Sequence, residues 1–113
     1  MVAFASVVVG GQDTTGGRND GNELLPRCQA AIASLDKDTW KDTHESFSAG
    51  FCLGLVEGIS YASPSVCPTK GVTLGQLERV LVKFLQDNPE QLNLNERELV
   101  VKALSKVFPC RSN

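Results

Sequence analysis

The residues of this chain best suited to chemistry are four cysteines and one histidine. Cys28, Cys52, Cys67 and Cys110 form an even set in a chain of 113 residues, which favours two disulfide bonds. No two of them are spaced Cys-x-x-Cys and His44 is the single histidine, so a zinc site with its close ligand pairs is not expected. Disulfides indicate an oxidising compartment such as the periplasm. The alternative is four reduced, buried cysteines in a cytosolic protein.

No catalytic site is expected from the remaining residue types. The chain has a single histidine, no thiol that we expect to be free and no Gly-x-Ser-x-Gly motif. These features exclude the hydrolytic triads. Asp42, His44 and Glu45 could form an acid–base or metal cluster, but acids are common at helix starts, so we interpret them as a solvated helix start. The paired glycines near the N-terminus lack the strand and helix of a phosphate loop. The sequence therefore predicts no catalytic residues, no metal and no cofactor.

The composition is that of one folded domain without a strong charge. Hydrophobic residues make up 42% and charged residues 21%, which argues against disorder. The formal net charge of −2 creates no strong field of one sign, so nucleic acid is not an expected partner. No apolar run approaches the ~18–20 residues that a membrane helix needs, so no membrane span is expected.

The first 21 residues differ in character from the rest of the chain. Residues 2–11 are apolar, but no Lys or Arg precedes them as in a complete export signal. They fit either a signal remnant or an artificial start in place of a natural leader. Residues 12–22 are rich in Gly, Thr, Asp and Asn, which is typical of a linker. We therefore expect a flexible N-terminal segment over residues 1–21 and a helical domain over residues 22–113.

The apolar periodicity within the helical domain predicts four helices and no strand. Polar or proline-containing segments end these helices, at residues 36–38, 62–71, 87–89 and 109. Capping residues begin them, namely Asn22, Asp42 or Thr43, Thr73 and Asn95. The expected fold is all-α, a small four-helix antiparallel bundle with two disulfides.

The second helix carries two distinct patterns. Phe47, Phe51, Leu55 and Ile59 form one apolar stripe that we expect to be buried. Glycine recurs every four residues on another face, and three helix glycines cost roughly 1 kcal/mol each relative to alanine. We expect another helix of the domain to pack closely there, and the alternative is a smooth groove for a partner. The charge and short apolar length oppose a membrane dimer.

The third helix and two aromatic residues complete the expected core. Glu78, Arg79 and Lys83 are predicted to face water on the third helix. Trp40 and Tyr61 lie near helix ends, where each is predicted to cover the core, although either could anchor an interface.

The predicted order of the helices also suggests which cysteines pair. Four cysteines allow three pairings. In an antiparallel hairpin, the start of one helix meets the end of the next, so Cys67 before the third helix should meet Cys110 after the fourth. Cys28 and Cys52 lie at comparable distances from the first turn. We therefore expect the bonds Cys28–Cys52 and Cys67–Cys110.

Four short motifs, in order, resemble a known family. Residues 50–59 resemble a Cys-Leu-Gly-Tyr-x-x-Gly helix motif, and residues 66–77 resemble a Cys-x-Pro, Val-Thr, Gln-Leu block. Residues 84–90 resemble a Tyr-Leu-x-x-His-Pro-Glu turn, and residues 107–110 a terminal Ala-Phe-Pro-Cys. Together they are similar to the Tai and Rap family of type VI secretion immunity proteins. Leu55 stands where the family has an aromatic residue and Asn88 where it has His, and Asn88 bears on which partner is recognised.

The resemblance implies a function as well as a fold. Family members are periplasmic, all-helical and often homodimers. They neutralise a cognate peptidoglycan amidase effector, a papain-like cysteine peptidase, by blocking its cleft. The alternative is an acid-stress chaperone of the HdeA type, and a third option is a carrier of an apolar ligand inside the bundle, which the few aromatic residues oppose.

Blocking a cleft requires a rigid protrusion, and the sequence offers two. The favoured one is the segment 87–94, where proline limits flexibility and Leu92 would act as an apolar plug. The second is Ala62–Gly71, braced by Cys67. The residues expected to bind the effector are Asp87, Asn88, Pro89, Glu90, Gln91 and Asn93.

Overall fold

The computed structural model describes residues 19–37 and 42–111, which fold into four α-helices. No strand occurs in these residues, only isolated bridges between Asp20 and Asn95 and between Val66 and Pro109. The all-α prediction is confirmed, whereas the predictions for residues 1–18 and Trp40 fall outside the described residues. The elements are α2 (Gly21–Lys37), α3 (Thr43–Ala62), α4 (Leu74–Asp87), the single 3₁₀ turn η1 (Pro89–Gln91) and α5 (Glu96–Val107).

Three of the four helices begin at the predicted caps. The carboxylate of Asp42 accepts a hydrogen bond from the backbone N–H of Glu45 at 2.8 Å. The hydroxyl of Thr73 and the side chain of Gln76 form a reciprocal capping box. The side chain of Asn95 accepts from the backbone of α5 in the same way. These bonds satisfy N–H groups that a helix start leaves without partners.

The predicted cap of α2 is wrong by two residues. Asp20, not Asn22, accepts a bond from the backbone N–H of Glu23, at 3.3 Å. Asn22 lies within the first turn of α2 and donates from its backbone and its side chain to the carbonyl of Leu92. The helix starts earlier because the chain before it is already paired with the start of α5.

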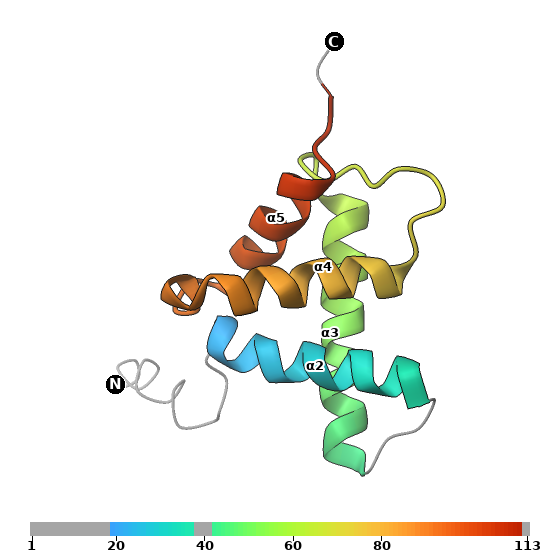
Figure 1. Cartoon of the computed structure of the whole chain (residues 1–113), viewed down its shortest axis with the longest axis vertical. Helices are drawn as coiled ribbons and strands as arrows, with labels where there is room; N and C mark the ends of the chain where they lie inside the picture. The colour runs from blue at the N-terminus through green and yellow to red at the C-terminus, as the bar shows by residue number, and fades with distance from the viewer. Residues whose placement is uncertain (1–18, 38–41, 112–113) are drawn as a thin grey trace, which may run out of the picture.

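The helices cross rather than forming a uniform parallel array. Figure 1 shows α2 and α4 side by side and running in opposite directions, with α3 lying steeply across both of them. Helix α5 packs against α3 and α4. The core lies where these helices meet, and its largest fully buried side chains are Leu24, Leu81, Leu85, Leu99, Leu104, Glu78, Val56 and Val100 with Cys28 and Cys52.

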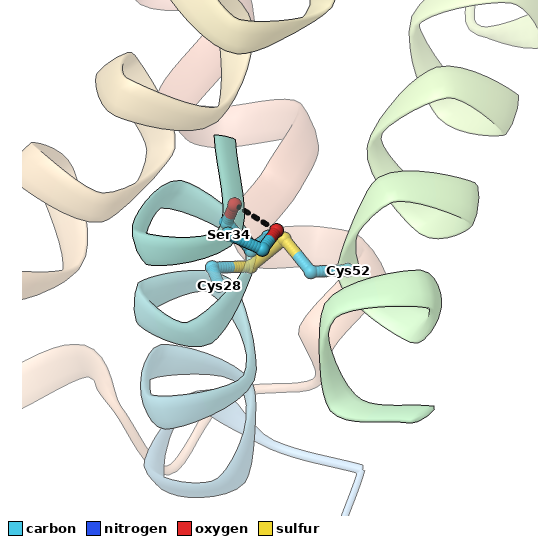
Figure 2. The surroundings of a disulfide bond; sticks show 4 residues. Cys28, Ser34 and Cys52 are labelled. Atoms are coloured by element: carbon cyan, nitrogen blue, oxygen red, sulfur yellow. Dashed lines mark hydrogen bonds between the residues drawn. A yellow bond between two sulfur atoms is a disulfide. The ribbon is translucent and has the colours of Figure 1, made fainter. Parts of the chain in front are cut away.

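Both predicted disulfides are present. Cys28 joins α2 to Cys52 of α3, as Figure 2 shows, and both residues are fully buried. Near this bond, the hydroxyl of Ser34 donates to the carbonyl of Ala31 at 2.8 Å, so that a buried polar group is satisfied. Cys67 joins the segment before α4 to Cys110 after α5. With sequence separations of 24 and 43 residues between the paired cysteines, the two bonds contribute roughly 3–4 kcal/mol each in the chain-entropy picture.

Helix α3 is rotated relative to the prediction. Its buried residues are Ser48, Ala49, Cys52 and Val56, whereas Phe47, expected in the buried stripe, is 60% exposed. The rest of that stripe is only half-buried against the core. The sequence could not decide this because apolar residues occupy nearly every side of the helix.

The glycines of α3 face outward, which overturns the expected internal helix contact. A Cβ atom placed on Gly50, Gly54 or Gly58 meets nothing within 4 Å. Tyr61, expected to cover the core, is 93% exposed on the same side of the helix. The described residues therefore leave this face open.

Glu78 lies in the core, although the sequence placed it on the wet side of α4. It precedes Leu81, Val82 and Leu85 by three, four and seven residues, so it shares their buried stripe. Its side chain is fully buried, and neither carboxylate oxygen has a hydrogen-bond partner among the described residues. Burial raises the pKa of this carboxyl from 4.5 to about 7, and the charge of Arg79 lowers it only in part.

Gly21 is the glycine that tertiary packing requires. A Cβ there would lie 2.7 Å from Cδ1 of Leu99 and 2.9 Å from the Cα of Leu92. The second neighbour is backbone and cannot move aside as a flexible side chain would. The start of α2 thus approaches the turn between α4 and α5 closely.

Glu78 should make the folded protein more stable in mild acid. Between pH 4.5 and about 7 the folded state binds the proton more tightly than the unfolded chain, so the free energy of unfolding falls as pH rises. We expect Glu78→Gln to raise this free energy by about 2 kcal/mol near pH 8 and to change it little near pH 4, as measured by urea unfolding. Exposed Glu98→Gln is the control. An unchanged pH dependence in Glu78→Gln would contradict this assignment.

Gly21 and Gly58 should respond in opposite ways to alanine. We expect Gly21→Ala to lower the free energy of unfolding by about 1–3 kcal/mol, because the new methyl group displaces the backbone at Leu92. The matched substitution Gly58→Ala adds a methyl group in open space and should raise it by up to about 1 kcal/mol through helix propensity. Thermal or urea unfolding measures both. Equal effects at the two positions would show that the close contact at Gly21 is not decisive.

Candidate functional site

The favoured contact segment forms a short, well-ordered turn between α4 and α5. Asn88 ends α4, and its backbone N–H and side-chain amide both donate to the carbonyl of Phe84, at 3.0 and 2.8 Å. Pro89 begins η1, since its fixed φ suits the first position of a helical turn. Asn95 then caps α5. Hydrogen bonds therefore hold the backbone of the turn on both sides.

Helix α2 holds the turn from a third side. The carbonyl of Leu92 accepts two hydrogen bonds from Asn22, at 3.1 and 3.2 Å. The backbone N–H of Glu96 donates to the carbonyl of Asn19 at 2.9 Å. Together with the close packing at Gly21, these contacts fix the turn relative to the helices. In Figure 1 the turn lies at the left end of α4, beside the start of α2.

The six predicted contact residues divide into two groups. Pro89, Glu90 and Asn93 are exposed, and Asp87 is exposed while it pairs with Lys83 at 3.0 Å. Each can reach a partner surface.

The other two predicted residues stabilise the turn itself. Asn88 and Gln91 are half-buried and hydrogen-bonded to one another at 3.5 Å. Leu92 was expected to project as an apolar plug, and this is wrong. Its side chain is half-buried and packs against the core beneath Gly21.

A groove next to the turn was not foreseen from the sequence. It lies between α4 and α5 and measures about 330 Å³. Val80 and Phe84 are spaced four residues apart, as are Ala103 and Val107, which is the signal that could have suggested a shared apolar surface. Of these residues, Val107 is 50% exposed. The lining residues are Val80, Lys83, Phe84, Asp87, Asn88, Ala103, Lys106 and Val107.

The groove and the exposed side of the turn form one continuous candidate surface, because Asp87 and Asn88 belong to both. Lys83 and Lys106 add positive charge at the groove, whereas Asp87 and Glu90 add negative charge at the turn. Such a surface can receive an apolar side chain in the groove and offer hydrogen-bond acceptors beside it.

The second candidate segment lies at the other end of α4 (Figure 1). It is braced where the backbone N–H of Cys67 donates to the carbonyl of Phe108 at 2.9 Å, next to the disulfide to Cys110. Val66 is buried in this region. Pro64, Ser65, Thr69 and Lys70 are exposed. Both candidate segments are therefore anchored.

His44 has the surroundings of a helix start. It is exposed in the first turn of α3, beside the capping bond from Glu45 to Asp42. Among residues 19–37 and 42–111, no three His, Cys, Asp or Glu side chains are grouped closely enough to bind a metal ion. All four cysteines are bonded in disulfides. Within the same ranges no helix combines the length and the apolar character needed to cross a bilayer.

The chain matches the family model of Rap1a immunity proteins over residues 20–110. No curated protein and no solved structure matches it. The matched range contains all four helices, both disulfides and the turn, and it begins at the residue that caps α2. The chain therefore belongs to the Rap1a immunity protein family, whose members are not enzymes.

Proposed function

We propose that this protein binds and blocks the active-site cleft of a type VI secretion peptidoglycan amidase effector and so protects the producing bacterium. Membership of an immunity protein family implies a cognate toxin as partner. The observation that carries the choice of surface is the anchored turn that presents Asp87, Pro89, Glu90 and Asn93 beside the α4–α5 groove. A rigid turn loses little conformational freedom on binding, which favours affinity.

The chemistry of the turn suits such a cleft. An amidase of the papain-like type carries a cysteine–histidine pair, whose imidazolium can donate hydrogen bonds. Asp87 and Glu90 supply carboxylate acceptors, and charge-assisted hydrogen bonds of this kind are the strong ones. Asn88 stands where the resembling family has His, and its side chain is used within the turn. The identity of the partner therefore depends more on the exposed residues around Asn88.

The proposed location is the periplasm, where peptidoglycan lies. The two disulfides are consistent with an extracytoplasmic, oxidising compartment. We also propose a homodimer, as the family resemblance implies.

The chaperone alternative fits less well. A chaperone of the HdeA type must unfold in acid to act. Burial raises the pKa of Glu78 and also that of Glu96, so both carboxyls favour the folded state as pH falls. The disulfide across α2 and α3 further opposes unfolding.

The turn should account for most of the inhibition. We expect the triple variant Asp87→Ala, Glu90→Ala, Asn93→Ala to weaken inhibition of the cognate amidase by about 30-fold or more, the equivalent of at least ~2 kcal/mol. These side chains are exposed, so circular dichroism and the melting temperature should change little. The measurement is peptidoglycan cleavage by the amidase at increasing concentrations of each variant.

The second segment supplies a matched control. The triple variant Ser65→Ala, Thr69→Ala, Lys70→Ala removes equally exposed side chains at the other end of α4 and should retain inhibition. Loss of inhibition in this variant alone would place the contact in the second segment. Retention of inhibition by both variants would show that neither segment enters the cleft. No binding to the amidase by the wild-type protein would overturn the proposed function.

A further inference from the structure

The two disulfides differ in how easily solvent reaches them. Cys28 and Cys52 are both 0% exposed, between α2 and α3. Cys67 is exposed and Cys110 is half-buried, and both lie outside the helices, in the segments before α4 and after α5. A thiolate must reach a sulfur atom in order to exchange with a disulfide, so exposed disulfides are the labile ones. Exposure therefore favours reaction at Cys67–Cys110 over reaction at Cys28–Cys52.

Contacts other than the sulfur–sulfur bond also hold the two segments together. The backbone N–H of Cys67 donates to the carbonyl of Phe108 at 2.9 Å. Val66, the preceding residue, is 3% exposed and forms an antiparallel bridge with Pro109. These contacts join the same segments as the disulfide and do not need it. Cleavage of the bond should therefore leave Cys67 and Cys110 beside one another.

The helices themselves are held by other means. The buried disulfide joins α2 to α3, and Leu81 and Leu85 of α4 pack with Leu99 and Leu104 of α5 in the core, fully buried. None of these contacts involves the segments that carry the exposed disulfide. We propose that Cys67–Cys110 is a site of reversible thiol–disulfide exchange with a dithiol, at which this bond opens and closes while the domain stays folded.

The reaction begins at the more exposed residue. One thiolate of the dithiol attacks Sγ of Cys67, the bond between the two sulfur atoms breaks, and Cys110 leaves as a thiolate that takes up a proton from water. A mixed disulfide now joins Cys67 to the dithiol.

The second thiol of the dithiol completes the exchange. After losing its proton it attacks the dithiol's own sulfur in the mixed disulfide, and Cys67 leaves as a thiolate and is protonated. Two electrons have then passed to the protein: the dithiol is oxidised to a disulfide, and the two cysteines are reduced to thiols. An oxidised dithiol reverses these steps.

This site lies at the other end of α4 from the turn between α4 and α5. Exchange there acts on the segment 62–71 and on the residues after α5, and it leaves the hydrogen bonds of the turn intact. The inference therefore does not rest on the proposed function, and no amidase enters its test.

The first test compares the two disulfides within one molecule. The oxidised full chain is incubated with dithiothreitol near pH 8 without denaturant, samples are alkylated with iodoacetamide at intervals, and the peptides are identified by mass spectrometry. We expect Cys67 and Cys110 to be alkylated at least about tenfold faster than Cys28 and Cys52, because only the first pair is accessible. Circular dichroism should show unchanged helix content in the selectively reduced protein. Replacement of dithiothreitol by oxidised glutathione should re-form the bond without urea.

The second test identifies the sulfur that is attacked. Thioredoxin whose second active-site cysteine is replaced by serine cannot resolve a mixed disulfide, so it should remain covalently joined to this protein through Cys67. The double variant Cys67→Ala, Cys110→Ala keeps the buried disulfide and should form no such complex.

Each alternative result has a definite meaning. Equal rates of alkylation at all four cysteines, or no reduction of Cys67–Cys110 without urea, would overturn the exchange site. Loss of helix content on selective reduction would overturn exchange in the folded state, and failure of the bond to re-form would overturn its reversibility. A complex joined through Cys110, or one formed by the double variant, would overturn attack at Cys67.

Discussion

The disulfide between Cys28 and Cys52 is the constraint on which much of this structure depends. It fixes α2 across α3 and requires the side of α3 that carries Cys52 to face the core. With 3.6 residues per turn, that choice turns Gly54 to the opposite side of the helix. One covalent bond therefore sets both the composition of the core and the surface that α3 presents.

The core that forms around this bond is not uniformly apolar. Glu78 lies among leucine and valine side chains, where its ionised form is disfavoured. Such a residue makes the fold less stable at neutral pH than an apolar residue of similar size would. The disulfides offset part of that cost, which matters in a domain that buries only about two-thirds of the surface its unfolded chain exposes.

The turn between α4 and α5 and the open side of α3 are built in different ways. The turn between α4 and α5 is held by backbone hydrogen bonds and by the close approach of Gly21, so its exposed polar residues are presented in a fixed arrangement. The open side of α3 carries Gly50, Gly54 and Gly58, with Phe47 and Tyr61 exposed toward its two ends. An immunity protein needs no chemistry of its own, and the fold holds the turn between α4 and α5 rigid.

The sequence by itself determined the features that depend only on neighbouring residues, such as the helix starts. Caps at Asp42, Thr73 and Asn95 set the helix starts, because a side chain next to a helix start can satisfy its N–H groups without help from the rest of the chain. The cysteine pairing followed from helix order, and the ordered motifs led to the family.

Only the tertiary structure decided which way each helix faces. Periodicity identifies a buried side when one face is apolar and the other polar, but α3 is apolar on nearly all sides, so the pattern could not distinguish its core face from its exposed face. It likewise could not show that Leu92 packs beneath Gly21, since this contact joins elements distant in the sequence. Such positions are set by contacts between elements, and a single sequence records those contacts only indirectly.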